Sequence, residues 1–450
     1  MNYQTVNPFD QSVISKYDYL DEKDLPIVLK NAQIAYKNWR KSDFKQRSVL
    51  LLQIADLLES QKFKAAELMA IEMGKPLAQG IAEVEKCALC CRHYANYSKS
   101  YLEKTPIDVP EGKAWIQYQP LGVIFGIMPW NFPFWQVIRF AIPALAGGNV
   151  ILLKHAPNVF GCANFIQDIF EQAGTPKHAF QNLIISEELA KTVIESPIVK
   201  GVTLTGSVGA GSKVGEITGK QIKPIVLELG GNNPFIVFPD ADMDLVLSQA
   251  EAKLQNAGQS CIAPKRFLIH KDLSQNFIDK LKYIIDNYSV NDPLSEETKL
   301  GPLARLDLAE KLEEQVARTV KNGAVELVKF RREDAKVWPC LLSNVTSDSP
   351  AFEEELFGPV FCITEFSTIE EAIDLANKSD FGLGASVFTK NESIQNRLVD
   401  ELEEGAVFIN SIVKSDPLLP FGGIGISGIG RELGEPGIKA FQNVKTVRIA

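Results

Sequence analysis

The chain has little of three features that mark other classes of protein: basic charge, long apolar runs and histidine. Its 450 residues carry 47 basic and 56 acidic side chains, a net charge of −9, so it lacks the basic surplus that a groove for nucleic-acid phosphates needs. The longest apolar stretches, residues 121–130 and 141–153, contain glycine or proline and fall short of the ~20 residues that span a bilayer. We therefore expect no nucleic-acid partner and no membrane span.

Cysteine and histidine are sparse as well. The seven cysteines are an odd number, thinly spread, which is typical of a reducing compartment rather than of a disulfide framework. The N-terminus lacks the basic start and apolar segment of a signal peptide, so we expect a cytoplasmic protein. The four histidines fit neither H-E-x-x-H nor a G-x-S-x-G elbow, which disfavours zinc and serine hydrolases.

Two local patterns invite a functional interpretation that the rest of the chain does not support. Cys87, Cys90 and Cys91 share a face of a predicted helix, but no second ligand pair follows, so we expect buried apolar thiols and no metal site. Residues 423–428 read G-x-G-x-x-G, but only 22 residues remain after them, too few for the unit of about 30 residues that a dinucleotide fingerprint opens. We expect a glycine-rich turn there.

Hydrophobic periodicity predicts the organisation of the chain. A length of 450 residues exceeds one ordinary core of about 150 residues. Apolar residues recur at helical spacing in the first hundred residues. After residue 114, short apolar runs alternate with amphipathic segments, which predicts two α/β units with parallel sheets, joined near residues 230–231. The predicted strands are 121–128, 150–154, 181–186, 201–205, 225–229, 234–238, 266–270 and 406–410.

Three segments together supply the parts of a thiol-based reaction. Residues 129–133 read Pro-Trp-Asn-Phe-Pro, residues 227–231 read Leu-Glu-Leu-Gly-Gly, and residues 256–261 end in Gly-Gln-Ser-Cys. Alone, each has an ordinary alternative: a rigid turn, a solvated carboxylate at a strand end, and a structural cysteine. Together, a nucleophilic thiol, a carboxylate base and an amide donor suit chemistry through a thiohemiacetal and a thioester. A free thiol is mostly protonated at neutral pH, so we expect this one to be activated.

These motifs, with Glu-Glu-Leu-Phe-Gly-Pro-Val at 354–360 and Pro-Phe-Gly-Gly at 420–423, resemble the aldehyde dehydrogenase superfamily over nearly the whole chain. The resemblance implies an α/β fold with three parts. Residues 1–98 and 121–230 would form a Rossmann-type cofactor domain, and 231–426 an α/β catalytic domain. Residues 99–120 and 427–450 would form a β-hairpin oligomerisation element, giving a homodimer or homotetramer.

The resemblance also implies catalytic roles. Cys261 corresponds to the nucleophile that attacks the aldehyde, and Asn131 to the oxyanion site, together with the backbone N–H of Cys261. Glu228 corresponds to the general base that activates water for hydrolysis of the thioester. A CoA-acylating relative would lack that base, a cysteine hydrolase would need a histidine in these motifs, and an inactive scaffold would be expected to have lost Cys261 or Glu228.

The implied cofactor is NAD or NADP. Pro157 stands where NAD-preferring members often carry a glutamate that repels a 2′-phosphate, which leaves NADP open. Residues 206–211 follow a strand and open a helix, where free N–H groups can meet a pyrophosphate; a capped helix start is the alternative. The residues expected at the cofactor are Trp130, Lys154, Gly206, Ser207, Gly211, Leu229, Glu355 and Phe357.

The implied substrate is a small aldehyde with a distal carboxylate. Arg139 and Ser415 lie where succinate-semialdehyde dehydrogenases hold that carboxylate, and a guanidinium suits it geometrically; a salt bridge is the alternative for Arg139. Gln255 replaces a second arginine of many such enzymes, and Ala263 replaces a second cysteine, so we expect no redox switch. Succinic semialdehyde is the favoured substrate, with glutaric semialdehyde or another small aliphatic or carboxylated aldehyde as the alternative.

Overall fold

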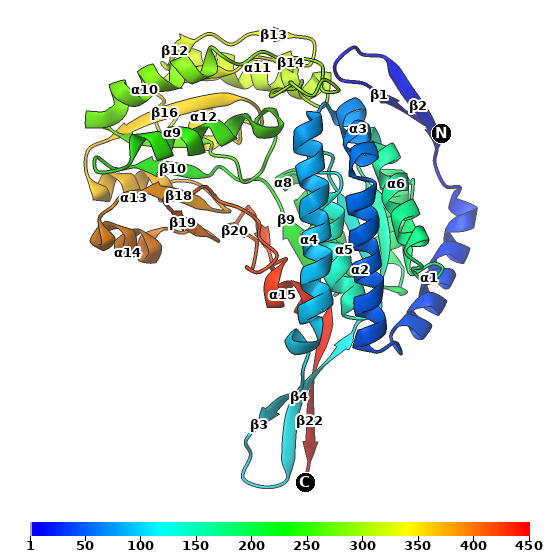
Figure 1. Cartoon of the computed structure of the whole chain (residues 1–450). Helices are drawn as coiled ribbons and strands as arrows, with labels where there is room; N and C mark the ends of the chain where they lie inside the picture. Colours follow the sequence, from blue (N-terminus) through cyan, green and yellow to red (C-terminus); the bar gives the residue numbers. More distant parts are fainter. Residues whose placement is uncertain (1) are drawn as a thin grey trace.

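The computed structural model describes residues 2–450. Two α/β bodies lie side by side, and a three-stranded sheet projects from them (Figure 1). The parallel α/β architecture expected from the alternation of apolar runs and helices is therefore confirmed. No helix among residues 2–450 is long and apolar enough to cross a membrane.

The first body contains a six-stranded sheet in the order β21-β9-β8-β5-β6-β7. Neighbours from β9 to β7 are parallel, and β21 runs antiparallel to β9. Its strands are β5 (Val123–Met128), β6 (Val150–His155), β7 (Phe180–Asn182), β8 (Val199–Thr205), β9 (Ile225–Glu228) and β21 (Gly428–Ile429). The strand expected at 181–186 is shorter because residue 186 is a serine that caps the next helix, where its Oγ accepts from the N–H of Leu189 at 3.2 Å.

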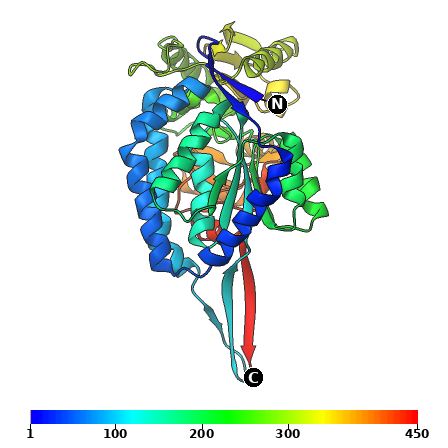
Figure 2. The same ribbon diagram turned by 90° about the vertical axis from the view of Figure 1, so that its right-hand side faces the viewer.

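Eight helices of the described chain surround this sheet (Figure 2). They are α1 (Leu25–Trp39), α2 (Phe44–Ser60), α3 (Lys62–Met73), α4 (Leu77–Tyr101), α5 (Trp135–Ala146), α6 (Phe160–Gln172), α7 (Glu187–Glu195) and α8 (Val208–Lys220). Strands β5 and β6 are buried almost throughout, which explains their continuous apolar sequence. Cys87, Cys90 and Cys91 lie fully buried in the same core, as expected for apolar thiols.

The second body contains a seven-stranded sheet in the order β12-β15-β16-β11-β10-β18-β19, parallel except for β12. Successive residues of its strands enter separate cores on the two faces, as Ile236 and Val237 do. Its strands are β10 (Pro234–Val237), β11 (Arg266–His270), β12 (Val325–Val328), β15 (Cys340–Ser343), β16 (Val360–Phe366), β18 (Ala385–Phe388) and β19 (Val407–Ile409). Its main helices are α9 (Met243–Glu251), α10 (Lys271–Ile285), α11 (Leu306–Lys321), α13 (Ile369–Asn377) and α14 (Glu392–Glu401).

The projecting sheet joins β3 (Thr105–Ile107), β4 (Lys113–Pro120) and β22 (Gln442–Ile449). The C-terminal strand pairs antiparallel with β4 along its whole length. The boundary differs from the expected 427–450, because β21 pairs with β9 and α15 (Gly434–Lys439) packs against α4 and α5. The G-x-G-x-x-G segment forms the expected glycine-rich turn between two short strands, β20 (Ile424–Gly425) and β21.

Candidate active site

Asn131 lies between the end of β5 and the start of α5, in a segment that is fixed from both sides. Its backbone carbonyl accepts from Lys75 Nζ at 2.9 Å and from Asn256 Nδ2 at 2.8 Å. Its own Nδ2 donates to the carbonyl of Gln259 at 3.1 Å, two residues before Cys261. The amide predicted for the oxyanion site is therefore held next to the cysteine segment.

A buried ion pair that the sequence analysis missed supports this segment. Lys75, between α3 and α4, pairs with Glu83 on α4. The Glu83 carboxylate also accepts from the N–H groups of Phe134 and Trp135, both at 2.9 Å. A carboxylate at the N-terminus of α5 satisfies donors that the helix itself leaves free. The pair thus fixes both Asn131 and the helix that follows it.

Cys261 follows a strained turn. Asn256, Ala257 and Gly258 have φ values of 50°, 51° and 75°, the left-handed region that costs non-glycine residues energy and is found at functional sites. The carbonyl of Cys261 accepts from Asn233 Nδ2 at 2.6 Å. A Cβ on Gly231 would lie 2.5 Å from that carbonyl oxygen, so the second glycine of the 227–231 motif permits this close approach.

The surroundings of the Cys261 thiol do not activate it. Burial raises its pKa to about 11, against the opposing effects of Arg139 and Lys265, while Glu355 and Glu228 add to the rise. The expectation of an activated thiol is therefore wrong for the protein alone, because desolvation of the thiolate outweighs the two cations. The thiol of the free protein is therefore protonated at neutral pH.

Glu228 ends β9 with its side chain only 2% exposed. Neither carboxylate oxygen has a hydrogen-bond partner among the described residues. Burial and the nearby Glu432 raise the pKa of Glu228 well above its ordinary value, while Arg139 and Arg431 oppose the rise. A carboxyl group with a raised pKa suits a general base near neutral pH.

Arg139 on α5 is 1% exposed and forms an ion pair with Glu432. Its Nη2 donates to Thr205 Oγ1 at 3.3 Å, and its guanidinium carbon lies 4.6 Å from the ring centroid of Phe421. The salt bridge considered as an alternative for Arg139 is therefore present, and it is buried. A role toward substrate stays a prediction.

Ser415 lies beside the same helix, whereas Gln255 does not join it. The Oγ of Ser415 accepts from Lys86 Nζ at 2.6 Å and from Trp135 Nε1 at 3.1 Å. The side chain of Gln255 is exposed. Lys86, on α4, was not singled out in the sequence.

Residues expected at the cofactor lie at the ends of β6, β8 and β9. Lys154 is buried at the end of β6, and burial lowers its pKa against the effect of Glu187. Ser207 caps α8, where its Oγ accepts from the N–H of Ala210 at 3.3 Å, and the N–H of Gly206 donates to the carbonyl of Glu228 at 3.0 Å. A Cβ on Gly211 would lie 2.5 Å from the side chain of Leu229, so α8 packs closely on that residue.

Aromatic rings and a second ion pair lie next to Cys261. Trp130 and Phe357 meet edge to face with centroids 5.9 Å apart. Lys265, also missed in the sequence, has its Nζ 4.8 Å from the Phe357 centroid and 3.5 Å from Glu355 Oε1. The same Glu355 oxygen accepts from the N–H of Gly231 at 3.3 Å.

The donor set around these residues fits a nicotinamide dinucleotide. A Cβ added at Gly209, in the first turn of α8, would meet nothing within 4 Å, so the helix start has room for a phosphate. Lys154 offers a buried cation, and Trp130 and Phe357 offer aromatic surface.

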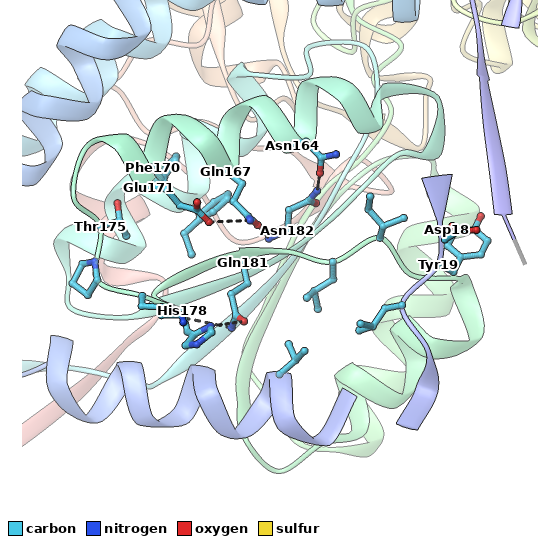
Figure 3. Close-up of a pocket in the computed structure, with 17 residues that line it drawn as sticks. Asp18, Tyr19, Asn164, Gln167, Phe170, Glu171, Thr175, His178, Gln181 and Asn182 are labelled. Atoms are coloured by element: carbon cyan, nitrogen blue, oxygen red, sulfur yellow. Dashed lines mark hydrogen bonds between the residues drawn. The ribbon is translucent and has the colours of Figure 1, made fainter. Parts of the chain in front are cut away.

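A separate cavity of about 700 Å³ lies beside β7 and α6 (Figure 3). Its polar side chains bond to one another: Gln167 to Glu171, Asn182 to Asn164, and His178 to Gln181. None of the residues predicted for catalysis, cofactor or substrate lines it.

Comparison with known proteins agrees with this geometry. Residues 1–447 match the model of the aldehyde dehydrogenase family, and the chain belongs to that family. It is 44% identical to a probable NADP⁺ succinate-semialdehyde dehydrogenase of Synechocystis and 41% identical to succinate-semialdehyde dehydrogenase [NADP(+)] 1 of Mycobacterium tuberculosis, in both cases over 100% of each chain.

Solved structures show the same likeness. The structure of succinic semialdehyde dehydrogenase from Streptococcus pyogenes with NADP⁺ has a TM-score of 0.97, 35% identity and 99% coverage of each chain. That of the protein Gox0499 has a TM-score of 0.98, 38% identity and 100% coverage of each chain. The aldehyde dehydrogenase fold expected from the sequence is confirmed.

Proposed function

We propose that this protein oxidises succinic semialdehyde to succinate with NAD or NADP, through a thiohemiacetal and a thioester on Cys261. The observation that carries the proposal is the convergence of three segments. The Asn131 amide bonds to the segment that precedes Cys261, and Gly231, three residues after Glu228, lies against the Cys261 backbone. A partly buried thiol, a buried amide donor and a buried carboxyl group therefore share one site.

The chain's own residues account for the bond changes. Cys261 Sγ forms a C–S bond to the aldehyde carbon, and its proton passes through solvent to the former carbonyl oxygen, which gives the thiohemiacetal. That proton returns to water when the carbon is oxidised to the thioester. Asn131 Nδ2 and the N–H of Cys261 stabilise the oxyanion, and one such donor is typically worth about 3 to 4 kcal/mol. The nicotinamide, when bound, supplies the acceptor for the hydride. Glu228 then takes a proton from water, whose oxygen attacks the thioester; the C–S bond breaks and the carboxylate leaves.

The cofactor would be held by Lys154, the start of α8 at Gly206 and Ser207, and Glu355 and Phe357 near the nicotinamide end. Because Pro157 offers no carboxylate to repel a 2′-phosphate, and because several relatives are named for NADP⁺, we propose that NADP is used. Comparing kcat/KM for NADP and NAD tests this, and strict NAD dependence would contradict it.

The substrate proposal is supported by the names of the relatives and by the buried Ser415 hydroxyl, which contacts the Lys86 ammonium. The presence of Glu228 argues against transfer of the acyl group to CoA. Glutaric semialdehyde has the same two functional groups and is the second candidate.

The test is the absorbance of reduced nicotinamide on mixing the protein, NAD or NADP, and succinic semialdehyde without CoA. Cys261→Ala should abolish the signal. Glu228→Gln should keep a single-turnover burst while steady-state turnover falls, because only deacylation needs the base. Absence of signal with every small aldehyde would refute the enzymatic proposal.

The projecting sheet is proposed as the oligomerisation element of a homodimer or homotetramer. The register places Ile107 and Val444 on the same face of this sheet. Both are exposed, Val444 by 58%, and an exposed apolar face of this kind is typical of an interface between subunits. Light scattering of the chain with and without residues 442–450 tests this. A reducing compartment such as the cytoplasm, which we also propose, would keep Cys261 as a thiol.

A further inference from the structure

Among the hydrogen bonds of residues 2–450, the Ser415 hydroxyl only accepts, so its own hydrogen is not used. Its oxygen accepts from Lys86 Nζ and from Trp135 Nε1, and both of those groups can only donate. The Ser415 side chain is buried, and with two donors directed at its oxygen the O–H hydrogen must point to some other acceptor. A buried hydroxyl that presents its hydrogen in this way is suited to an anionic or carbonyl oxygen.

Lys86 is the cation of this group whose charge is not balanced. None of the ion pairs within residues 2–450 includes Lys86, whereas the nearby Arg139 is paired with Glu432. The Lys86 ammonium is half-buried, lies 4.2 Å from the Trp135 ring centroid and bonds to Ser415. An unpaired ammonium in such a place gains from an anion that arrives with the ligand.

The position of this group relative to the thiol follows from α5. Trp135 and Arg139 are four residues apart and therefore share a face of the helix. Lys86 lies one helical turn after Glu83 on α4, and the Glu83 carboxylate accepts from the N–H of Trp135 at 2.9 Å. Asn131, four residues before Trp135, bonds through its Nδ2 to the carbonyl of Gln259, two residues before Cys261. The Lys86 ammonium and the Ser415 hydroxyl therefore lie at the end of α5 that faces the segment carrying the thiol.

We propose that Lys86, together with the Ser415 hydroxyl, binds the distal carboxylate of the aldehyde substrate and makes the enzyme selective for carboxylated aldehydes. This inference rests on the proposed function. Gln255 stands where many succinate-semialdehyde dehydrogenases have a second arginine, and its side chain is exposed. Lys86 would supply the positive charge that Gln255 lacks. The guanidinium of Arg139 remains committed to Glu432.

The test compares kcat/KM for succinic semialdehyde with kcat/KM for butanal, a four-carbon aldehyde without the carboxylate, at pH 7. Lys86→Met keeps the aliphatic stem and removes the charge. A charge-assisted hydrogen bond corresponds to about a tenfold to hundredfold effect, so the ratio of the two values should fall by that factor, mainly through a higher KM for succinic semialdehyde. Lys86→Arg should retain most of the ratio.

The matched control is Lys64→Met on α3, an exposed lysine whose loss changes the net charge equally; it should leave the ratio unchanged. A ratio in Lys86→Met within twofold of the wild type would overturn the inference, as would an equal loss for both substrates, which would make Lys86 a structural residue. A wild type that oxidises both aldehydes equally well would instead refute the substrate proposal, and one that oxidises neither would refute the enzymatic proposal.

Discussion

Replacing Arg139 by methionine should destabilise the protein and slow oxidation of every aldehyde. The substitution leaves the buried Glu432 without its cation, beside Glu228, which is also buried and without a hydrogen-bond partner among the described residues. Breaking a buried ion pair by removing one partner costs about 3 to 5 kcal/mol. At about 2 to 4 °C per kcal/mol for a unit of 150 to 250 residues, Tm should fall by about 6 to 20 °C.

The kinetic effect should accompany the loss of stability. Arg139 is one of two arginines that oppose the rise in the pKa of Glu228, so its removal raises that pKa further and leaves less of the base ionised at neutral pH. Deacylation should then slow for succinic semialdehyde and butanal alike. The double variant Arg139→Met, Glu432→Gln removes both charges and should regain most of the Tm, with a coupling of about 1 to 3 kcal/mol.

The assays are thermal unfolding and steady-state rates with both aldehydes. An unchanged Tm together with a loss confined to succinic semialdehyde would refute this reasoning. That result would show that Arg139 contacts the substrate carboxylate directly, the role that the resemblance implies.

Three further outcomes follow from the same site. Glu228→Gln should raise Tm, and more at pH 8 than at pH 5. The pKa of this carboxyl in the folded protein lies above its ordinary value of 4.5, so the wild type loses about 1 to 3 kcal/mol of stability as the pH rises above 4.5. Equal gains in Tm at both pH values would contradict this. The KM for succinic semialdehyde should rise between pH 7 and 9.5, because Lys86 loses its charge in that range. Burial, and then Arg139, lower the pKa of Lys86 to about 8, while Cys87, Glu83 and Cys90 oppose this fall. The KM for butanal should not rise, and in Lys86→Arg the rise for succinic semialdehyde should disappear. Gly211→Ala should destabilise the protein by about 1 to 3 kcal/mol and raise the KM for cofactor, because the added Cβ would lie 2.5 Å from the side chain of Leu229. The control is Gly219→Ala in the same helix, where an added Cβ would meet nothing within 4 Å. This control should be neutral or stabilising in thermal unfolding.

The sequence could predict that the site residues come together, because much of their placement follows from the strands that they end. Asn131 and Glu228 lie at the carboxyl ends of β5 and β9, which are parallel strands of one sheet with β8 between them. Carboxyl ends of parallel strands share an edge, and ligands bind there in α/β folds. Short buried runs and glycine pairs can be recognised in the sequence. Once they predict the parallel sheet, they also predict the positions of Asn131 and Glu228.

The charged partners from α4, from the loop before β11 and from the segment after β21 were harder to find, since no local pattern relates these segments to that edge. Glu432 and Lys265 become significant only when the chain has folded back on itself. One signal was present in α4: Glu83 falls on the buried face with Gly80, Val84 and Cys87. A carboxylate at an apolar position of a helix requires a partner, and that partner is Lys75.

The net charge of −9 would repel an anionic substrate and a dinucleotide, but only over a short range, because physiological salt screens exposed charges beyond about 8 Å. Within that range the sign of the field depends on buried groups. Lys86, Lys154 and Lys265 are buried or half-buried, and burial lowers the pKa of each. Anionic ligands offset this penalty by pairing with the ammonium groups. The same desolvation that makes these lysines costly in the free protein therefore makes them selective for carboxylate and phosphate.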